Sequence, residues 1–111
     1  MINIEKKDKI DIISFSVTKI NALIVDDIRD GILKIFDNSN LRVVIDLTGV
    51  EYVDSSGFGC FLSAMKAARN TYSVLKFANP EPKVTELFEL LHLHTVFQIY
   101  PDMDSCLRSF R

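Results

Sequence analysis

The sequence predicts an α/β fold with a mixed, mainly parallel sheet, in one domain that spans residues 1–111. Residues 42–47 form an apolar run with almost no alternation, which is typical of a parallel strand covered on both faces. Other strand-like runs alternate with amphipathic segments of helical periodicity, as expected when helices connect parallel strands. A chain of 111 residues with 48% hydrophobic residues can bury one core without disulfides. The expected element order is β β α β α β α β α.

A hairpin of two short strands is expected at the start of the chain. Ile2 and Ile4 alternate with polar residues, and a second apolar run leads from Ile10 to Val17. Residues 7–9, Lys-Asp-Lys, separate the two runs but lack the Asn-Gly or Asp-Gly pair that favours a tight turn. The many charges of the first run suit an exposed edge strand.

The first helix is expected to follow Asn21, a residue type that commonly caps helix N-termini. Apolar residues then recur at helical spacing, while Asp26, Asp27 and Asp30 fall on the opposite, solvated side. The polar run 37–40 has the turn chemistry that ends such a helix. The apolar stripe comprises Ile20, Ile24, Ile28, Ile32 and Ile35 or Phe36.

The second helix is expected to start at a hinge, residues 54–57, and to run to Asn70. In the bend before the hinge, Val50 and Val53 are apolar and are expected to anchor it to the core. The expected inward face of the helix comprises Phe58, Phe61, Leu62, Met65 and Ala68, with the small residues Gly57, Gly59 and Ala64 allowing close approach to the sheet.

The last third of the chain repeats the alternation of strand and helix. A strand over residues 73–78 leads into a turn, and Pro82 suits the first turn of the helix that follows. Residues 95–100 have the pattern of a final strand, and Asp102 is expected to cap a terminal helix. The inward positions of these two helices are Val84, Leu87, Phe88 and Leu91, then Met103, Cys106, Leu107 and Phe110.

The hinge Asp54-Ser55-Ser56-Gly57 is the strongest candidate for a functional site. Its two hydroxyls lie at a helix N-terminus, where backbone N–H groups lack intrahelical partners and the helix dipole is positive. An anion placed on such a hydroxyl can be stabilised there, so the hinge is a candidate phosphorylation switch. An ordinary N-cap with a tight turn explains the same composition without any switch.

Charge and hydropathy argue against several classes of function. The net charge of −2 and the absence of a dense basic cluster give no footprint for nucleic acid or for an anionic membrane surface. No stretch approaches the roughly 18 apolar residues of a membrane span, and the first residues lack the apolar region of a signal peptide. We therefore expect a cytoplasmic protein in which the isolated Cys60 and Cys106 are buried free thiols.

No catalytic set emerges from the remaining residues. His92 and His94 are two residues apart, so they do not share a helical face, and nothing nearby supplies further metal ligands. We expect neither a metal nor a cofactor. A Ser–His–acid triad through Ser55 or Ser56 would lack the Gly-x-Ser-x-Gly turn of serine hydrolases.

Residues 43–59, Val-Val-Ile-Asp-Leu-Thr-Gly-Val-Glu-Tyr-Val-Asp-Ser-Ser-Gly-Phe-Gly, resemble the signature region of the STAS domain, and specifically the single-domain anti-sigma-factor antagonists of bacteria. The element order extends the resemblance over essentially the full chain, and Ala-Asn-Pro at 78–80 resembles the family's turn before the third helix. Two segments depart from the family pattern. Thr-Lys-Ile-Asn at 18–21 replaces a Gly-Glu-Leu-Asp type stretch, and Asn-Thr-Tyr at 70–72 replaces a Gly-Gly turn. The kinase-contact surface is expected to differ at the first of these.

The resemblance implies a non-enzymatic switch protein. The family's phosphoacceptor serine carries over to Ser55, and Ser56 matches the neighbouring serine that is not the acceptor. The unphosphorylated protein would bind a serine kinase that also acts as an anti-sigma factor and make it release its client, and a serine phosphatase would be a second partner. We expect a monomer in which support of the switch loop and contact with the partner come from Asp54, Ser56, Gly57, Phe58 and Asn21.

Two other functions remain open from the sequence. Some single STAS domains are accessory subunits of membrane transport complexes, and the same resemblance admits that role. A small hydrolase built on a serine nucleophile is the third hypothesis.

Overall fold

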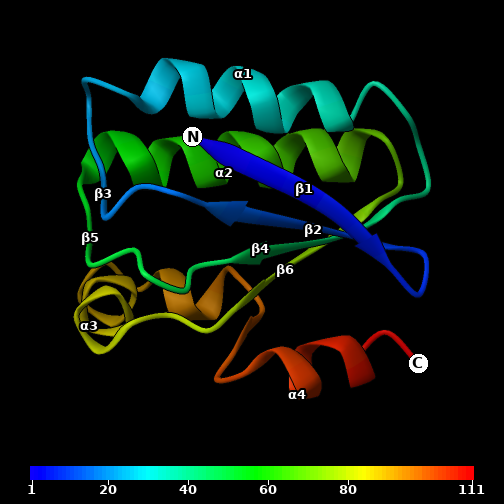
Figure 1. Ribbon diagram of the computed structural model, residues 1–111. Coiled ribbons are helices and arrows are strands. Elements are labelled where there is room, and N and C mark those ends of the chain that lie inside the picture. The colour runs from blue at the N-terminus through cyan, green and yellow to red at the C-terminus, as the bar shows by residue number, and fades with distance from the viewer.

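A five-stranded sheet lies at the centre of the computed structural model, which describes residues 1–111 (Figure 1). Its strand order is β1-β2-β4-β6-β7, in which β1 and β2 are antiparallel and all other neighbours are parallel. The predicted mixed, mainly parallel sheet is therefore confirmed. The strands are β1 (Ile2–Lys7), β2 (Ile10–Phe15), β3 (Lys19–Ile20), β4 (Arg42–Asp46), β5 (Tyr52–Val53), β6 (Val74–Ala78) and β7 (Ile99–Tyr100), and the helices are α1 (Val25–Ile35), α2 (Ser55–Asn70), α3 (Pro82–Leu90), η1 (Leu93–Thr95) and α4 (Met103–Arg108).

Helices α1 and α2 lie side by side on one face of the sheet, and α4 lies on the other (Figure 1). The main core between the sheet, α2 and α3 contains a cluster of phenylalanine rings. Phe58 of α2 packs edge-to-face on Phe88 of α3 with ring centroids 5.0 Å apart, and Phe61 packs on Phe77 of β6 at 5.2 Å. These contacts fix the first turns of α2 against both α3 and the sheet.

A smaller core lies under α4. Lys76 of β6 is buried on this face, and its Nζ donates hydrogen bonds to the Ser109 carbonyl oxygen at 3.2 Å and to the Ser109 hydroxyl at 2.8 Å. The same ammonium lies 4.3 Å from the ring centroid of Phe110. Because a buried cation is stable only with such partners, Lys76 fastens the end of the chain to the sheet. The apolar contacts here come from Ile10, Ile12, Val44, Ala78 and Cys106.

The start of α1 differs from the prediction by one turn. The expected cap, Asn21, precedes a separate turn over residues 22–24, in which the N–H groups of Ile24 and Val25 both donate to the Asn21 carbonyl oxygen, at 3.1 and 3.0 Å. Its side-chain Oδ1 accepts from the N–H of Leu23 at 3.0 Å, so it stabilises this turn and not the helix itself. The prediction that Asn21 caps α1 is therefore wrong.

The final strand is shorter than predicted. His92 has a left-handed backbone with φ of 58°, and a 3-10 turn over residues 93–95 follows it, so only Ile99 and Tyr100 pair with β6. The strands β3 and β5 were not predicted, because two-residue strands carry no periodic pattern. Leu62, expected on the inward stripe of α2, is instead 38% exposed.

The predicted N-terminal hairpin is present, and its turn is formed by Asp8 and Lys9. Their φ angles are 52° and 65°, the left-handed values that a two-residue hairpin turn of the primed type requires at both positions. Asp tolerates this conformation, whereas Lys is strained in it because its Cβ approaches the carbonyl oxygen. The hairpin therefore forms without the glycine that normally accompanies such a turn.

Replacing Lys9 with Gly should stabilise the protein by about 0.5–1 kcal/mol, because Gly removes the left-handed strain and only part of that gain is lost to the entropy of the unfolded chain. Urea unfolding monitored by circular dichroism measures the change. Lys9→Ala removes the same charge but keeps Cβ, so it should stay within about 0.5 kcal/mol of the wild type. Equal stability of the two variants would contradict the strain at residue 9.

Candidate functional site

The carboxylate of Asp54 holds together the start of α2 and the loop before α1. Asp54 is the N-cap of α2, with an extended backbone, and its Oδ1 accepts from the Gly57 N–H at 3.1 Å and from the Ser56 hydroxyl at 2.5 Å. Its Oδ2 accepts from the N–H of Ala22 at 3.2 Å. The hydrogen bond from the Ser56 hydroxyl is the largest cause that lowers the pKa of Asp54, followed by the Gly57 N–H. Asp54 is therefore an ionised acceptor at neutral pH.

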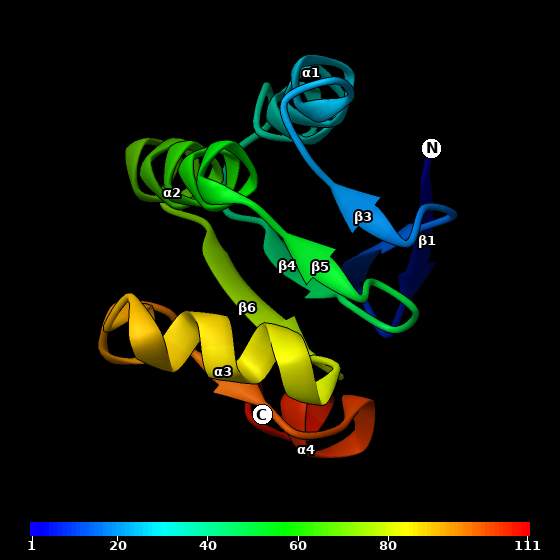
Figure 2. The ribbon, with the colours of Figure 1, turned by 90° about the vertical axis from the view of Figure 1, so that its left-hand side faces the viewer.

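A second small sheet braces the same bend from the other side. Strands β3 and β5 pair in parallel, Lys19 with Tyr52 and Ile20 with Val53, and the N–H of Asp54 donates to the Ile20 carbonyl oxygen at 3.0 Å. Figure 2 looks onto the end of the molecule where this sheet and the first turns of α1 and α2 lie together. Val50 and Val53 are both buried, so the predicted anchoring of the bend is confirmed. The hinge is thus a fixed structure.

The two serine hydroxyls have different environments. Ser56 is half-buried, and its hydroxyl proton is engaged by Asp54. Ser55 is exposed, and its hydroxyl has no hydrogen-bond partner within the protein. Only Ser55 therefore presents a hydroxyl that another molecule can reach without breaking an internal hydrogen bond.

Gly57 and Phe58 support the hinge from inside. Gly57 is buried, and a Cβ added to it would lie 2.5 Å from Val53 Cγ1 and 3.0 Å from Ile20 Cγ2. Phe58 is 3% exposed and faces the aromatic core. The open side of Gly57 is filled by the β3–β5 sheet, which confirms the predicted close approach at this residue and leaves no free surface there for the partner contact that we expected.

Gly59 is the glycine that faces outward. A Cβ added there would meet no atom within 4 Å, so the expectation that Gly59 lets the helix approach the sheet is wrong. Gly59 lies four residues after Ser55 and hence on the same face of α2. On this face of α2, therefore, no side chain projects from the position one turn after Ser55.

The loop that Asp54 holds also carries Leu23, a residue that the sequence interpretation missed. Leu23 is 91% exposed, and it follows Ala22, whose N–H binds Asp54. The signal was present in the sequence, since Leu23 falls outside the apolar stripe of the first helix. Asn21, expected at the partner surface, is half-buried and acts through its turn with Leu23.

The other candidate residues do not form a site with the hinge. Asp26, Asp27 and Asp30 are exposed on α1, as predicted. Cys60 and Cys106 are buried free thiols, also as predicted, and burial raises the pKa of each to about 11. No group of three or more His, Cys, Asp or Glu side chains is arranged to hold a metal ion, and no helix combines the length and apolar composition that crossing a membrane requires.

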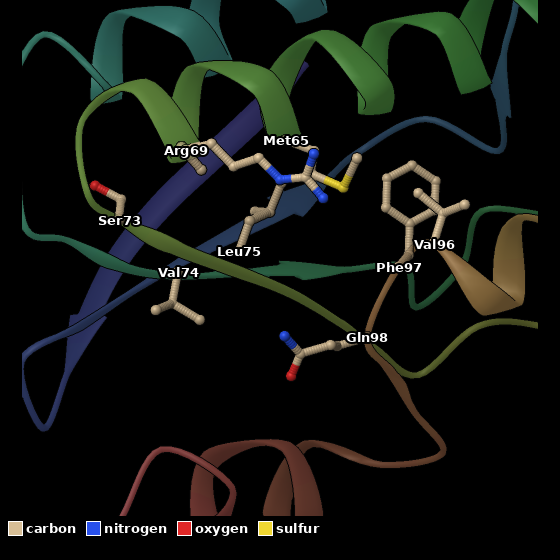
Figure 3. A pocket seen from close by; sticks show the side chains of 9 residues that line it. Met65, Arg69, Ser73, Val74, Leu75, Val96, Phe97 and Gln98 are labelled. Carbon is tan, nitrogen blue, oxygen red and sulfur yellow. The ribbon is translucent and has the colours of Figure 1, made fainter.

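The cavities of the molecule also lie away from the hinge, since none is lined by residues 54–59. A cavity of about 180 Å³ opens at the other end of α2, between that helix, β6 and residues 96–98 (Figure 3). Arg69 is its one charged lining residue, and Ser73 is its one hydroxyl. The hinge is therefore an exposed surface site and not an enclosed one.

These features define the class of molecule. It is an α/β domain in which the exposed N-terminus of α2 is held by hydrogen bonds to Asp54 and by the β3–β5 sheet. The family model of the STAS domain matches residues 1–106, and the chain belongs to the STAS domain family. The resemblance noted in the sequence is thereby confirmed.

Named relatives and solved structures fit this assignment. The anti-sigma-B factor antagonist of Listeria monocytogenes is 29% identical over 98 residues, which cover 88% of this chain and 86% of that protein. An anti-sigma-factor antagonist (STAS) domain protein from Planctomyces limnophilus has a TM-score of 0.89 at 22% identity, over 97% of this chain and 96% of that one. The Bacillus cell fate determinant SpoIIAA in its phosphorylated form has a TM-score of 0.71 at 16% identity, over 100% of both chains. These solved structures share the fold of this chain.

The two glycines of α2 provide a matched test of the hinge packing. Gly57→Ala should destabilise the protein by about 1–3 kcal/mol, because the new methyl group overlaps Val53 and Ile20. Gly59→Ala meets open space, so it should be neutral or stabilise by up to about 1 kcal/mol through helix propensity. Chemical denaturation of both variants gives the comparison, and equal effects would contradict the opposite facing of the two glycines.

The lowered pKa of Asp54 predicts a defined pH dependence. A carboxyl group whose pKa is depressed by folding contributes stability above its unfolded pKa, and this contribution is lost as the pH falls through the folded pKa. The stability difference between the wild type and Asp54→Asn should therefore be largest near neutral pH and shrink in acid. Carboxyl ¹³C NMR should give a midpoint for Asp54 below the ordinary Asp value, and Ser56→Ala should raise that midpoint. A midpoint that Ser56→Ala leaves unchanged would contradict the assigned cause.

Proposed function

We propose that this protein is an anti-sigma factor antagonist whose binding to a serine kinase, itself the anti-sigma factor, is controlled by phosphorylation of Ser55. The observation that carries the proposal is the difference between the two hinge hydroxyls. Ser55 is exposed and unengaged, whereas Ser56 is bound to Asp54. Relatives that carry the name anti-sigma factor antagonist support the general role.

Phosphorylation of Ser55 changes the surface without requiring a change of fold. The γ-phosphoryl group of ATP is transferred to the Ser55 oxygen, the bond to ADP breaks, and the hydroxyl proton leaves. The modification adds about −1.5 to −2 charges at neutral pH. The positive end of α2 tolerates this charge, but a docked partner would have to desolvate it next to the ionised Asp54.

The resulting cycle has two states. The unphosphorylated protein occupies the kinase, which releases its client, and the phosphorylated protein dissociates. A serine phosphatase restores the free hydroxyl of Ser55. In this cycle the protein is a binding partner and a substrate, and it performs no chemistry of its own.

The phosphoacceptor can be identified with two serine variants. After incubation with ATP and a panel of serine kinases of the anti-sigma-factor type from the protein's own host, mass spectrometry should find phosphate on Ser55 of the wild type. Ser55→Ala should abolish the modification, because it removes the accessible hydroxyl. Ser56→Ala should still be phosphorylated at Ser55, since it removes only an internal hydrogen bond. Phosphate on Ser56, or none with any kinase, would contradict the proposal.

A charge-mimicking variant tests the release step. Ser55→Asp should weaken binding of the kinase that modifies the wild type by at least about tenfold, while its thermal unfolding midpoint stays close to that of the wild type. Isothermal titration calorimetry measures the affinity, and Ser55→Asn controls for size without charge. Undiminished binding of Ser55→Asp would count against release by charge.

A further inference from the structure

Leu23 is the most exposed large apolar side chain of the protein, at 91%. A single exposed leucine is common on protein surfaces and needs no function by itself. The position of Leu23 is what distinguishes it. Its neighbour Ala22 donates a backbone hydrogen bond to the carboxylate of Asp54, and Asp54 directly precedes Ser55, so the turn that carries Leu23 is tied to the residue before the proposed switch.

The backbone around Leu23 is held on both sides. Its own N–H donates to the Asn21 side chain at 3.0 Å, and the N–H of Ala22 donates to Asp54 at 3.2 Å. Ile20 and Val25, which flank the turn, are buried in the main core. Leu23 is therefore presented outward by a turn of restrained backbone, and little backbone entropy remains to be lost when a partner covers it.

The surface next to Leu23 permits close contact. Ala22 is small and exposed, and Gly59 has open space in front of its Cα on the face of α2 that carries Ser55. Asp26 and Asp27 follow in the first turn of α1, where Asp26 pairs with Arg29 and Asp27 is exposed and has no ion pair. The exposed side chain of Leu23 therefore belongs to a turn that is hydrogen-bonded to the Ser55 end of α2 and that leads into the negatively charged Asp27.

We infer that Leu23 is the apolar anchor through which the serine kinase binds this protein and positions the Ser55 hydroxyl for phosphoryl transfer. This inference rests on the proposed function and adds to it a specific contact. The complementary surface on the kinase is an apolar pocket with a basic side chain on the rim that faces Asp27. Because Asp54 holds both the Leu23 turn and the start of α2, it acts as a positioning residue that keeps anchor and hydroxyl in one fixed relation.

The test compares Leu23→Gln with Tyr72→Asn. Tyr72 is 83% exposed at the opposite end of α2, and Asn tolerates its left-handed φ of 57°, so this variant removes an exposed apolar group away from Ser55. With the kinase that phosphorylates the wild type, Leu23→Gln should raise the Kd by at least about tenfold, the effect of losing one buried leucine contact. The kcat/KM for Ser55 phosphorylation should fall in proportion. Tyr72→Asn should change neither value.

The salt dependence of kinase affinity distinguishes an apolar contact of Leu23 from an electrostatic contribution of the neighbouring carboxylate. The loss caused by Leu23→Gln should persist between low and high salt, whereas the loss caused by Asp27→Asn should shrink as salt screens the rim. Wild-type affinity in Leu23→Gln, or an equal loss in Tyr72→Asn, would overturn the anchor while leaving Ser55 phosphorylation intact. Failure of the wild type to bind or be phosphorylated by any kinase in the panel would overturn the proposed function and the anchor together.

Discussion

The three hydrogen bonds to the Asp54 carboxylate are the interaction on which the rest of this site depends. One oxygen binds the first turn of α2 through Gly57 and Ser56, and the other binds the loop before α1 through Ala22. Two segments that are 32 residues apart in sequence are thereby joined by a single side chain. Charged acceptors make stronger hydrogen bonds than neutral ones, so this carboxylate is well suited to join helix and loop.

The parallel sheet explains why such a junction forms at this end of the molecule. In parallel α/β folds the strands end, and the next helices begin, along the same edge of the sheet. The loops at this edge are linked to one another by further polar contacts: Asn79 Nδ2 donates to Asp46 Oδ1 at 3.1 Å, and the Gly49 N–H donates to Glu81 Oε2 at 2.8 Å. Ser55 thus projects from a braced surface, so a charge added there acts on a partner more than on the fold.

The parts of the structure that follow from periodicity could be predicted, and those that depend on contacts between distant segments could not. The buried run of β4 and the apolar stripes of the helices indicated the sheet and its cover. The pairing of β3 with β5 and the bond from Ala22 to Asp54 join residues far apart in sequence and leave no local pattern. For the same reason Gly59 was wrongly placed on the covered face together with Gly57, because a helical start without a known neighbour does not reveal which glycine is covered.

The two adjacent serines show why one position suits a reversible charge and the other does not. A phosphate on Ser56 would remove the hydroxyl proton that Asp54 accepts and would place an anion where donor and acceptor are 2.5 Å apart. The repulsion would open the hydrogen bonds to Gly57 and Ala22, and the modification would then act by disrupting the hinge. A phosphate on the exposed Ser55 leaves these bonds in place. Asp54 therefore favours Ser55 over Ser56 as the site of the proposed switch, a distinction that composition alone does not make.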